Sequence, residues 1–282
     1  TIDMVGRIVA QKLGERVGQS VVVDNRGGAG GLIGVDTVAK AAPDGYTLCL
    51  CSSGALITSP MLLAKPPYDA RRDFAPITTV VSVPYLLLVR PSGGINSVKE
   101  LIVLAKHKPG TLNYGSAGSG STSHLAGAMF ASAAGIDVVH VPYKGSAPAA
   151  TDLIGGHLQF VFEAIGAATQ YVKSGRLRAL GISTPKRSAS LPDIPTISEM
   201  GVTDYQMVTW HSVCAPAATS KAIITKLNRE IVAGINEPDA RDRLTGLGTE
   251  IFSGTPQELR DLIAQEVPRW QKLLAQIGIG AN

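Results

Sequence analysis

Short apolar runs alternate with helical segments through the middle of this chain of 282 residues, between Ser97 and Ile182. The apolar runs predict four strands, at Leu112–Tyr114, Val138–Val141, Leu158–Phe162 and Arg178–Ile182. Helices are predicted between them: one that starts at Ser97 and stops at Pro109, then Leu125–Ala134, Ala149–Ile154 and Ala167–Val172. Because parallel strands need such crossover helices, this order predicts an α/β fold with a largely parallel sheet that helices cover on both faces.

The two ends of the chain predict a second α/β unit. The early elements are the helix Thr1–Val17, the strand Val21–Asp24, the glycine loop Gly27–Gly31, the helix Leu32–Ala42 and the strand Tyr46–Cys51. Apolar runs between Phe74 and Val89 are broken at Ser82 and Pro84, and Pro91–Gly94 has the composition of a linker.

The strand Val208–Ala215 is expected to lead the chain out of the middle unit, and two helices close the chain. The last helix begins with a capping box at Thr255–Glu258. We therefore predict two lobes, residues 1–90 plus 212–282 and residues 91–211. Each would hold a mixed, mostly parallel sheet, and two hinge crossings would join them.

Composition and charge exclude several classes of protein. The chain is 45% hydrophobic and 17% charged, which argues against disorder. Its longest apolar run, Val80–Val89, is much shorter than the roughly 20 residues of a membrane-spanning helix. The net charge of +4 is scattered, with one dense basic stretch at residues 173–178, which weakly favours anionic ligands over nucleic acid.

Cysteines and histidines do not indicate a metal site or any other cofactor. Cys49, Cys51 and Cys214 fit no zinc spacing, and Cys49 and Cys51 would share one face of a strand, where buried small hydrophobic side chains are the favoured interpretation. No two of the five histidines are three or four residues apart, as ligands on one helix would be.

A loop rich in glycine and serine, Tyr114–His124, follows a predicted strand and opens a helix. Its backbone N–H groups and hydroxyls would favour an anion at the helix N-terminus. No lysine follows to make a phosphate-binding loop, and the glycine spacing does not fit a nucleophile elbow. The loop at Gly27–Gly34 fails the dinucleotide-binding fingerprint because Ile33 stands at its third glycine position.

Two further candidates are weighed from the residues alone. Glu163 follows a predicted parallel strand, at the sheet edge where α/β proteins bind ligands, although an exposed carboxylate is as common there. A Ser-His-Asp arrangement could assemble from His124 or His140. The rival class is therefore an α/β hydrolase in which the Ser119–Ser123 loop forms an oxyanion site and His124 is the base. That class requires a nucleophile and a base within hydrogen-bond reach.

Six motifs in order resemble the Bug-type solute receptors of tripartite tricarboxylate transporters. They are Val22–Arg26 with Gly28–Gly31, Ala42–Leu48, Ser123–Gly127, Val141–Gly145, Gly175–Leu180 and Leu191–Thr196. The resemblance covers almost the whole chain. It implies a two-lobed periplasmic binding protein, type II-like, that is not an enzyme and that closes by a hinge on a small organic carboxylate for a transporter or a sensor.

The resemblance also implies a set of ligand-binding residues. In this family backbone amides, hydroxyls and ordered water typically hold the carboxylate. Carried over by position, the first lobe contributes Ser52, Ser53 and Gly54, and the second contributes Ser116, Ser121, Thr122, Ser123, Tyr143 and Glu163.

The chain departs from the family pattern at three places. Glu163-Ala164 stands where aspartate and asparagine are frequent, and His211-Ser212 follows Trp210 where glycine is common at the second position. A histidine there suggests pH-sensitive binding. The family also opens with an export signal, a strand and a loop before the helix that begins here, so we expect a periplasmic location and a gap, an irregular first lobe or a neighbouring chain in that slot.

Overall fold

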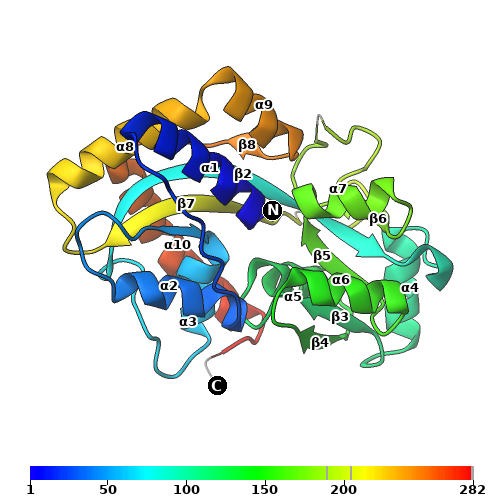
Figure 1. Ribbon diagram of the computed structural model, residues 1–282. Helices are drawn as coiled ribbons and strands as arrows, with labels where there is room; N and C mark the ends of the chain where they lie inside the picture. The colour runs from blue at the N-terminus through cyan, green and yellow to red at the C-terminus, as the bar shows by residue number, and fades with distance from the viewer. Residues whose placement is uncertain (189, 204, 281–282) are drawn as a thin grey trace. The chain divides into compact units, whose positions relative to one another are not determined.

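Contacts divide the chain into two units. Unit 1 comprises residues 1–82 and 209–282, and unit 2 comprises residues 83–208. The computed structural model describes residues 1–188, 190–203 and 205–280 (Figure 1). None of the described helices is long and apolar enough to cross a membrane.

Unit 1 is built from both ends of the chain. Its helices are α1 (Ile2–Val17), η1 (Ala29–Gly31), α2 (Leu32–Ala39), η2 (Gly54–Thr58), α3 (Ser59–Met61), α8 (Lys221–Ile235), α9 (Pro238–Gly246) and α10 (Pro256–Gln276). Its strands are β1 (Cys49–Ser52), β7 (Val208–Pro216), β8 (Glu250–Ile251) and the first part of β2 (Phe74–Val89). β1 pairs with β7 and β8 with β2, both antiparallel.

Helix α1 illustrates how the ends of the chain are joined. Its apolar stripe, which includes Val5, Ile8 and Leu13, is buried, and the helix packs on α8 and α9. On the same side Lys12 reaches Glu237 and Asp239 of the segment that starts α9, at 2.9 and 2.8 Å. Residues more than 200 positions apart therefore form one layer of helices.

Unit 2 contains the alternating segment. Its helices are η3 (Pro91–Gly93), α4 (Val98–His107), α5 (Thr122–Ala134), α6 (Ser146–Gly155) and α7 (Ile165–Lys173). Its strands are β3 (Asn113–Ser116), β4 (Val139–Pro142), β5 (Phe160–Ala164), β6 (Arg178–Ile182) and the second part of β2. The parallel pairs are β3 with β4 and β3 with β5, and α5 and α6 pack on β3 and β5 (Figure 1).

The sheet is mixed, as predicted, but with more antiparallel pairing than the alternation indicated. Within unit 2, β2 pairs antiparallel with β5 and β6. The two apolar runs predicted between Phe74 and Val89 form this single strand, because the breaks at Ser82 and Pro84 do not end the strand. Nearly all of its side chains are buried, so burial outweighs the local propensity of the interrupting residues.

Two other predictions about unit 1 were wrong. The segment Val21–Asp24 is not a strand: it is irregular, and the side chain of Val22 is 82% exposed. The sequence between β7 and the end of the described residues forms three helices, α8, α9 and α10, where two were predicted. The predicted capping box of α10 is confirmed, because Thr255 accepts from the Glu258 N–H while Glu258 accepts from the Thr255 N–H.

Candidate ligand-binding site

In unit 2 the predicted ligand-binding residues follow the carboxyl ends of three neighbouring parallel strands. Ser116 ends β3, Tyr143 follows β4, and Glu163 lies near the end of β5. The register of β3 with β4 and β5 brings these ends to one edge of the sheet. The Tyr143 N–H donates to the Ser116 carbonyl at 3.0 Å. This edge is where α/β sheets bind ligands in general.

The loop between β3 and α5 is closed by its own hydroxyls. Ser121 caps α5 by accepting from the His124 N–H and donates to the Gly118 carbonyl at 2.6 Å. Ser123 Oγ accepts from the Ala117 N–H at 3.0 Å and lies 3.2 Å from Ser121 Oγ. The structure therefore brings Ser116, Ser121, Thr122 and Ser123 together, and all four are buried.

A stack of rings supports this loop from behind. The His124 and His140 rings are 3.9 Å apart, and Tyr114 lies against both. His124 Nδ1 accepts from the Gly120 N–H at 3.1 Å, and His140 Nε2 lies 2.6 Å from Ser116 Oγ. Burial lowers the pKa of His124 to about 4 and, together with the neighbouring His124, that of His140 to about 3. Both imidazoles are thus neutral at pH 7.

Sequence reasoning missed the role of Tyr114 and His140 in positioning this loop. These two residues are direct partners in the parallel ladder of β3 and β4. Tyr114 also stacks on Phe160, with centroids 5.4 Å apart, so the support continues into the aromatic core of unit 2. The signal that was available is aromatic character on neighbouring predicted strands, because partners in a ladder share a face.

Glu163 is fully inside the protein, which rules out the exposed carboxylate weighed from the sequence. Its side chain is 4% exposed, and Oε1 accepts from the Ala164 N–H at 3.0 Å. Burial raises the pKa of this carboxyl, although hydrogen bonds from Ser146 and Ala164 oppose the shift. A raised pKa favours the protonated form, in which the carboxyl is a hydrogen-bond donor as well as an acceptor.

Tyr143 is half-buried, and its hydroxyl already has a partner. It donates to Asp152 Oδ2 of α6 at 2.6 Å, and burial together with this bond raises the pKa of Tyr143 to about 12. A hydroxyl held in this way is fixed in direction. It can still accept a hydrogen bond on its oxygen.

In unit 1 the predicted residues Ser52, Ser53 and Gly54 lie where β1 meets η2, so they begin a helical turn and are not an open loop. Ser52 Oγ accepts from the Ala55 N–H at 3.2 Å, and Ser53 Oγ lies 2.7 Å from Thr209 Oγ1 of β7. A Cβ on Gly31 would approach Ala55 Cβ to 2.6 Å. The glycine at this position of the loop thus allows the loop to pack closely against η2.

His211 lies directly opposite Ser52 in the ladder of β1 and β7. It is 3% exposed, and its Nδ1 has no hydrogen-bond partner within the part of the chain that the structure describes. The Nε1 of Trp210 is unpartnered in the same sense. Burial lowers the pKa of His211 to about 3. A buried polar atom without a partner costs stability, which makes this histidine a candidate ligand contact.

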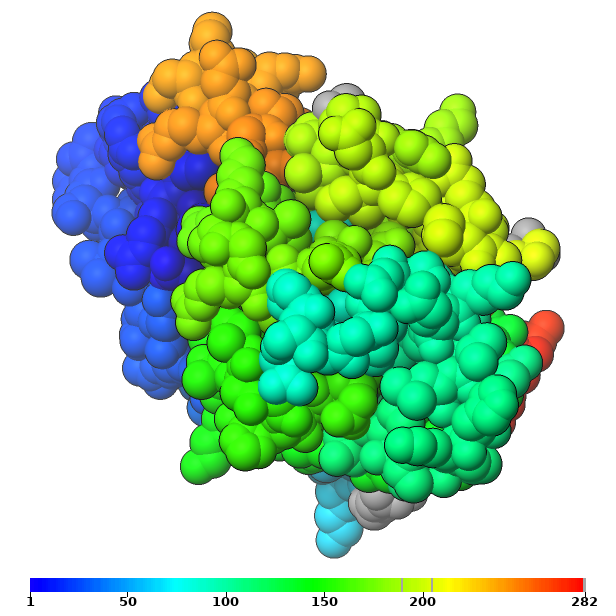
Figure 2. All heavy atoms as spheres, turned by 90° about the vertical axis from the view of Figure 1, so that its right-hand side faces the viewer, coloured from blue at the N-terminus to red at the C-terminus, as the bar shows by residue number. Residues whose placement is uncertain are grey.

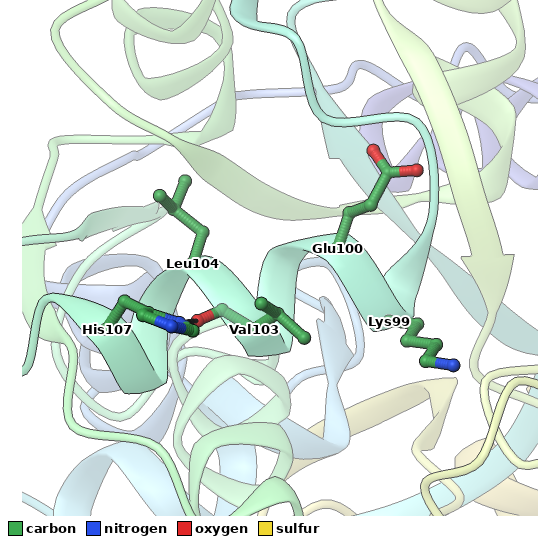
Figure 3. A pocket seen from close by; sticks show the side chains of 5 residues that line it. All are labelled: Lys99, Glu100, Val103, Leu104 and His107. Carbon is green, nitrogen blue, oxygen red and sulfur yellow. Dashed lines mark hydrogen bonds between the residues drawn. The ribbon is translucent and has the colours of Figure 1, made fainter.

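Among the described residues no three histidine, cysteine or acidic side chains are arranged so that they could hold a metal ion. A surface hollow in unit 2 lies away from the predicted site residues. The hollow, of about 390 Å³, is lined by Lys99, Glu100, Val103, Leu104 and His107 of α4. Figure 3 shows these side chains on one helix, with those of Glu100 and Leu104 pointing to the same side. The residues of α4, coloured teal, form part of an exposed face (Figure 2). None of the predicted site residues lines this hollow.

The serine and the histidine that lie in contact differ from those of the hydrolase site predicted at the Ser119–His124 loop. His124 Nδ1 is engaged by the Gly120 N–H, and Ser119 is exposed. The serine and histidine within 2.6 Å of each other are Ser116 and His140. Ser116 Oγ also accepts from the Gly118 N–H at 3.1 Å, and the lowered pKa of His140 makes it a weak base at neutral pH.

Curated relatives match this chain along its length. A protein of Pseudomonas sp. strain P51, described as the UPF0065 protein in the tcbD-tcbE intergenic region, is 38% identical over all of this chain and 84% of its own length. Protein BugT of Bordetella pertussis is 36% identical over 98% of this chain and 85% of its own.

Solved structures share the fold. The periplasmic binding protein BugD superposes with a TM-score of 0.94 at 35% identity. The structure of R. palustris Rpa4515 with adipate superposes with a TM-score of 0.95 at 36% identity. Each comparison covers 99% of this chain and 94% of the other. MatC from Rhodopseudomonas palustris with bound malate gives 0.91 at 29% identity, over 97% of this chain and 94% of the other. The mixed α/β fold is thus that of periplasmic binding proteins, as predicted.

The model of one protein family extends over almost the whole chain. Its description is tripartite tricarboxylate transporter family receptor, and it matches residues 5–279. The six sequence motifs predicted this assignment. The chain belongs to the tripartite tricarboxylate transporter family of receptors.

Proposed function

We propose that this protein is a periplasmic receptor that binds a small organic carboxylate and delivers it to a tripartite tricarboxylate-type transporter or to a sensor. The observation that carries the proposal is the set of buried hydroxyl side chains, Ser116, Ser121, Thr122 and Ser123, at the carboxyl edge of β3, β4 and β5. Such donors suit a carboxylate without an arginine clamp. Relatives of the same fold are described with adipate and with malate.

The proposal assigns the two units the roles of two lobes. Ser52, Ser53 and Gly54 would contribute from unit 1, and Ser116, Ser121–Ser123, Tyr143 and Glu163 from unit 2. A protonated Glu163 would donate a hydrogen bond to one carboxylate oxygen of the ligand. An ionised Glu163 would instead repel the ligand carboxylate. Hinge closure over the ligand would then complete the site, as in other binding proteins of this architecture.

A thermal-shift screen against mono-, di- and tricarboxylates, with adipate and malate included, tests the proposal. A ligand at 100 times its Kd stabilises the native state by about 2.7 kcal/mol, which raises the melting temperature measurably. Titration calorimetry then gives the Kd of each hit. Failure of every carboxylate, while an unrelated ligand class stabilises the protein, would contradict the proposal.

A matched pair of variants on α5 locates the site. Ser123→Ala removes a buried hydroxyl of the proposed site, whereas Ser132→Ala removes an exposed hydroxyl from the same helix. We expect the first to weaken carboxylate binding by about tenfold, the value of one hydrogen bond of about 1.4 kcal/mol, and the second to leave the Kd unchanged. Equal Kd values for both variants would place the ligand elsewhere.

The Ser116–His140 contact of 2.6 Å is the one observation that favours a hydrolase. An ester substrate such as p-nitrophenyl acetate separates the two functions. We expect no turnover above that of a His140→Gln variant, because a histidine of such low pKa takes up a proton poorly at pH 7. Turnover that disappears in this variant would favour the enzyme.

A further inference from the structure

Three cysteines from distant parts of the sequence lie together in unit 1. Cys49 and Cys51 are on β1 and Cys214 is on β7, and all three are buried, at 6%, 2% and 0% exposure. The Ser212 hydroxyl oxygen lies 3.7 Å from the Cys51 sulfur and 4.0 Å from the Cys214 sulfur. Since alternate residues of a strand share a face, all three sulfurs lie on the same side of the β1–β7 ladder. Neither the proposed site nor any other function described above uses them.

The register of the two strands distinguishes between the possible pairs. Cys49 is the direct partner of Cys214, whereas Cys51 is the partner of Ser212. Direct partners in an antiparallel ladder have Cα atoms about 4.5–5.5 Å apart, within the 4.4–6.8 Å that a disulfide spans. In such a ladder, diagonal neighbours such as Cys51 and Cys214 have Cα atoms about 7–8 Å apart, which is longer than a disulfide spans without backbone movement. Cys49 and Cys51 point the same way from one strand and cannot bridge.

We propose that Cys49 and Cys214 form a cross-strand disulfide when the chain folds in an oxidising medium, and that Cys51 stays a free thiol. The bond forms by exchange with a disulfide donor, either a small-molecule disulfide or a thiol oxidase. One thiolate attacks the donor and displaces one donor thiol, and the second cysteine then displaces the other. The protein loses two hydrogen atoms, and the donor gains them as two thiols.

Burial decides when this reaction takes place. In the folded protein the neighbouring Cys51 and the loss of solvent both raise the pKa values of Cys49 and Cys214, and no reagent reaches these buried thiols directly. The thiols are accessible in the unfolded chain, so oxidation accompanies folding. Once formed, the bond is as buried as the thiols it replaces, and reductants reach it only after unfolding. It fixes β1 to β7, which are separated by most of the chain.

Refolding in a glutathione redox buffer tests the proposal independently of the function proposed above. The reduced, denatured protein is refolded with mixed oxidised and reduced glutathione, trapped with an alkylating reagent, and digested without reduction. We expect one cross-linked peptide pair that contains Cys49 and Cys214, an intact mass lower by two hydrogen atoms before alkylation, and an alkylated Cys51 only after denaturation. A higher melting temperature than that of protein refolded with dithiothreitol should accompany the bond.

Single variants identify the pair. Cys51→Ser should form the same disulfide, whereas Cys49→Ser and Cys214→Ser should form none. Cys49→Val and Cys214→Val keep an apolar side chain of similar volume, so they give a folded comparison where a serine variant does not fold. Three free thiols in natively refolded protein, or a disulfide that includes Cys51, would overturn the proposal. Unchanged ligand binding in the oxidised protein would leave the proposed function intact in either case.

Discussion

Gly127 of α5 allows the supporting rings to reach the proposed binding loop. A Cβ at this position would lie 2.2, 2.5 and 3.0 Å from three atoms of the Tyr114 ring. The ring has little room to retreat, because Tyr114 is 3% exposed and stacks on Phe160 at a centroid distance of 5.4 Å. We therefore predict that Gly127→Ala destabilises the protein, although alanine is the better residue for a helix.

Two opposing terms set the size of the effect. Overpacking a core by one methyl group typically costs about 1–3 kcal/mol. Alanine in place of glycine inside a helix stabilises by about 1 kcal/mol. Contacts as short as 2.2 Å require the ring to move by more than 1 Å by comparison with ordinary carbon contacts of about 3.5 Å, which favours the upper part of the range. The net loss should be about 1–2 kcal/mol.

Urea unfolding of the whole chain, followed by near-ultraviolet circular dichroism, measures this loss. Gly246→Ala at the end of α9 is the matched control, because a Cβ there meets no heavy atom within 4 Å. We expect the control to gain a few tenths of a kcal/mol from helix propensity. If Gly127→Ala proves as stable as the parent, Tyr114 is not held against α5 as described, and the account of the loop's support is wrong.

Three further perturbations test other parts of the structure. The pKa of His124 in the folded protein, about 4, lies below its ordinary value of 6.5, so the neutral histidine stabilises the protein fully above pH 6.5 and this contribution is lost as the pH falls toward 4. His124→Asn keeps an acceptor for the Gly120 N–H and should therefore flatten the dependence of the melting temperature on pH between pH 7.5 and 4.5. Lys12 lowers the pKa values of Glu237 and Asp239, so the stability that these carboxylates contribute is complete above their ordinary pKa values of 4.5 and 3.8 and is lost as the pH falls through the lowered values. Lys12→Met should weaken this acid transition in a pH series of melting curves, whereas the bond from Arg16 to Glu237 remains. Thr255→Ala removes the cap of α10 and should cost about 1 kcal/mol in chemical unfolding, with Thr255→Ser close to the parent.

Local signals predicted much of unit 2. Strand β6 has the predicted bounds, Arg178–Ile182, and Ser97 caps α4 as expected. These features depend on side chains within a few residues of one another, so short-range patterns are sufficient. The family resemblance likewise depended on short motifs, and the comparisons confirm it.

Features that depend on distant partners were not predictable in the same way. Val21–Asp24 has strand composition, but β-propensity mainly measures packing on a pleated surface, and the segment has no partner strand among the described residues. Conversely, β2 stays extended through Pro84 because neighbouring strands pair with it. The contact of His140 with Ser116 depends on the register in which β3 and β4 pair, and this register could not be predicted from the sequence.

The division of unit 1 between the chain ends has a consequence for the order of folding. Residues 83–208 are continuous, so unit 2 can begin to fold while the rest of the chain is still being synthesised. Helix α1 has to wait until α8 follows, because the two pack together across about 200 residues of sequence, and contacts of such separation form slowly. The part of the apolar stripe of α1 that packs on α8 therefore stays uncovered until late in synthesis, and a chaperone could protect it until then.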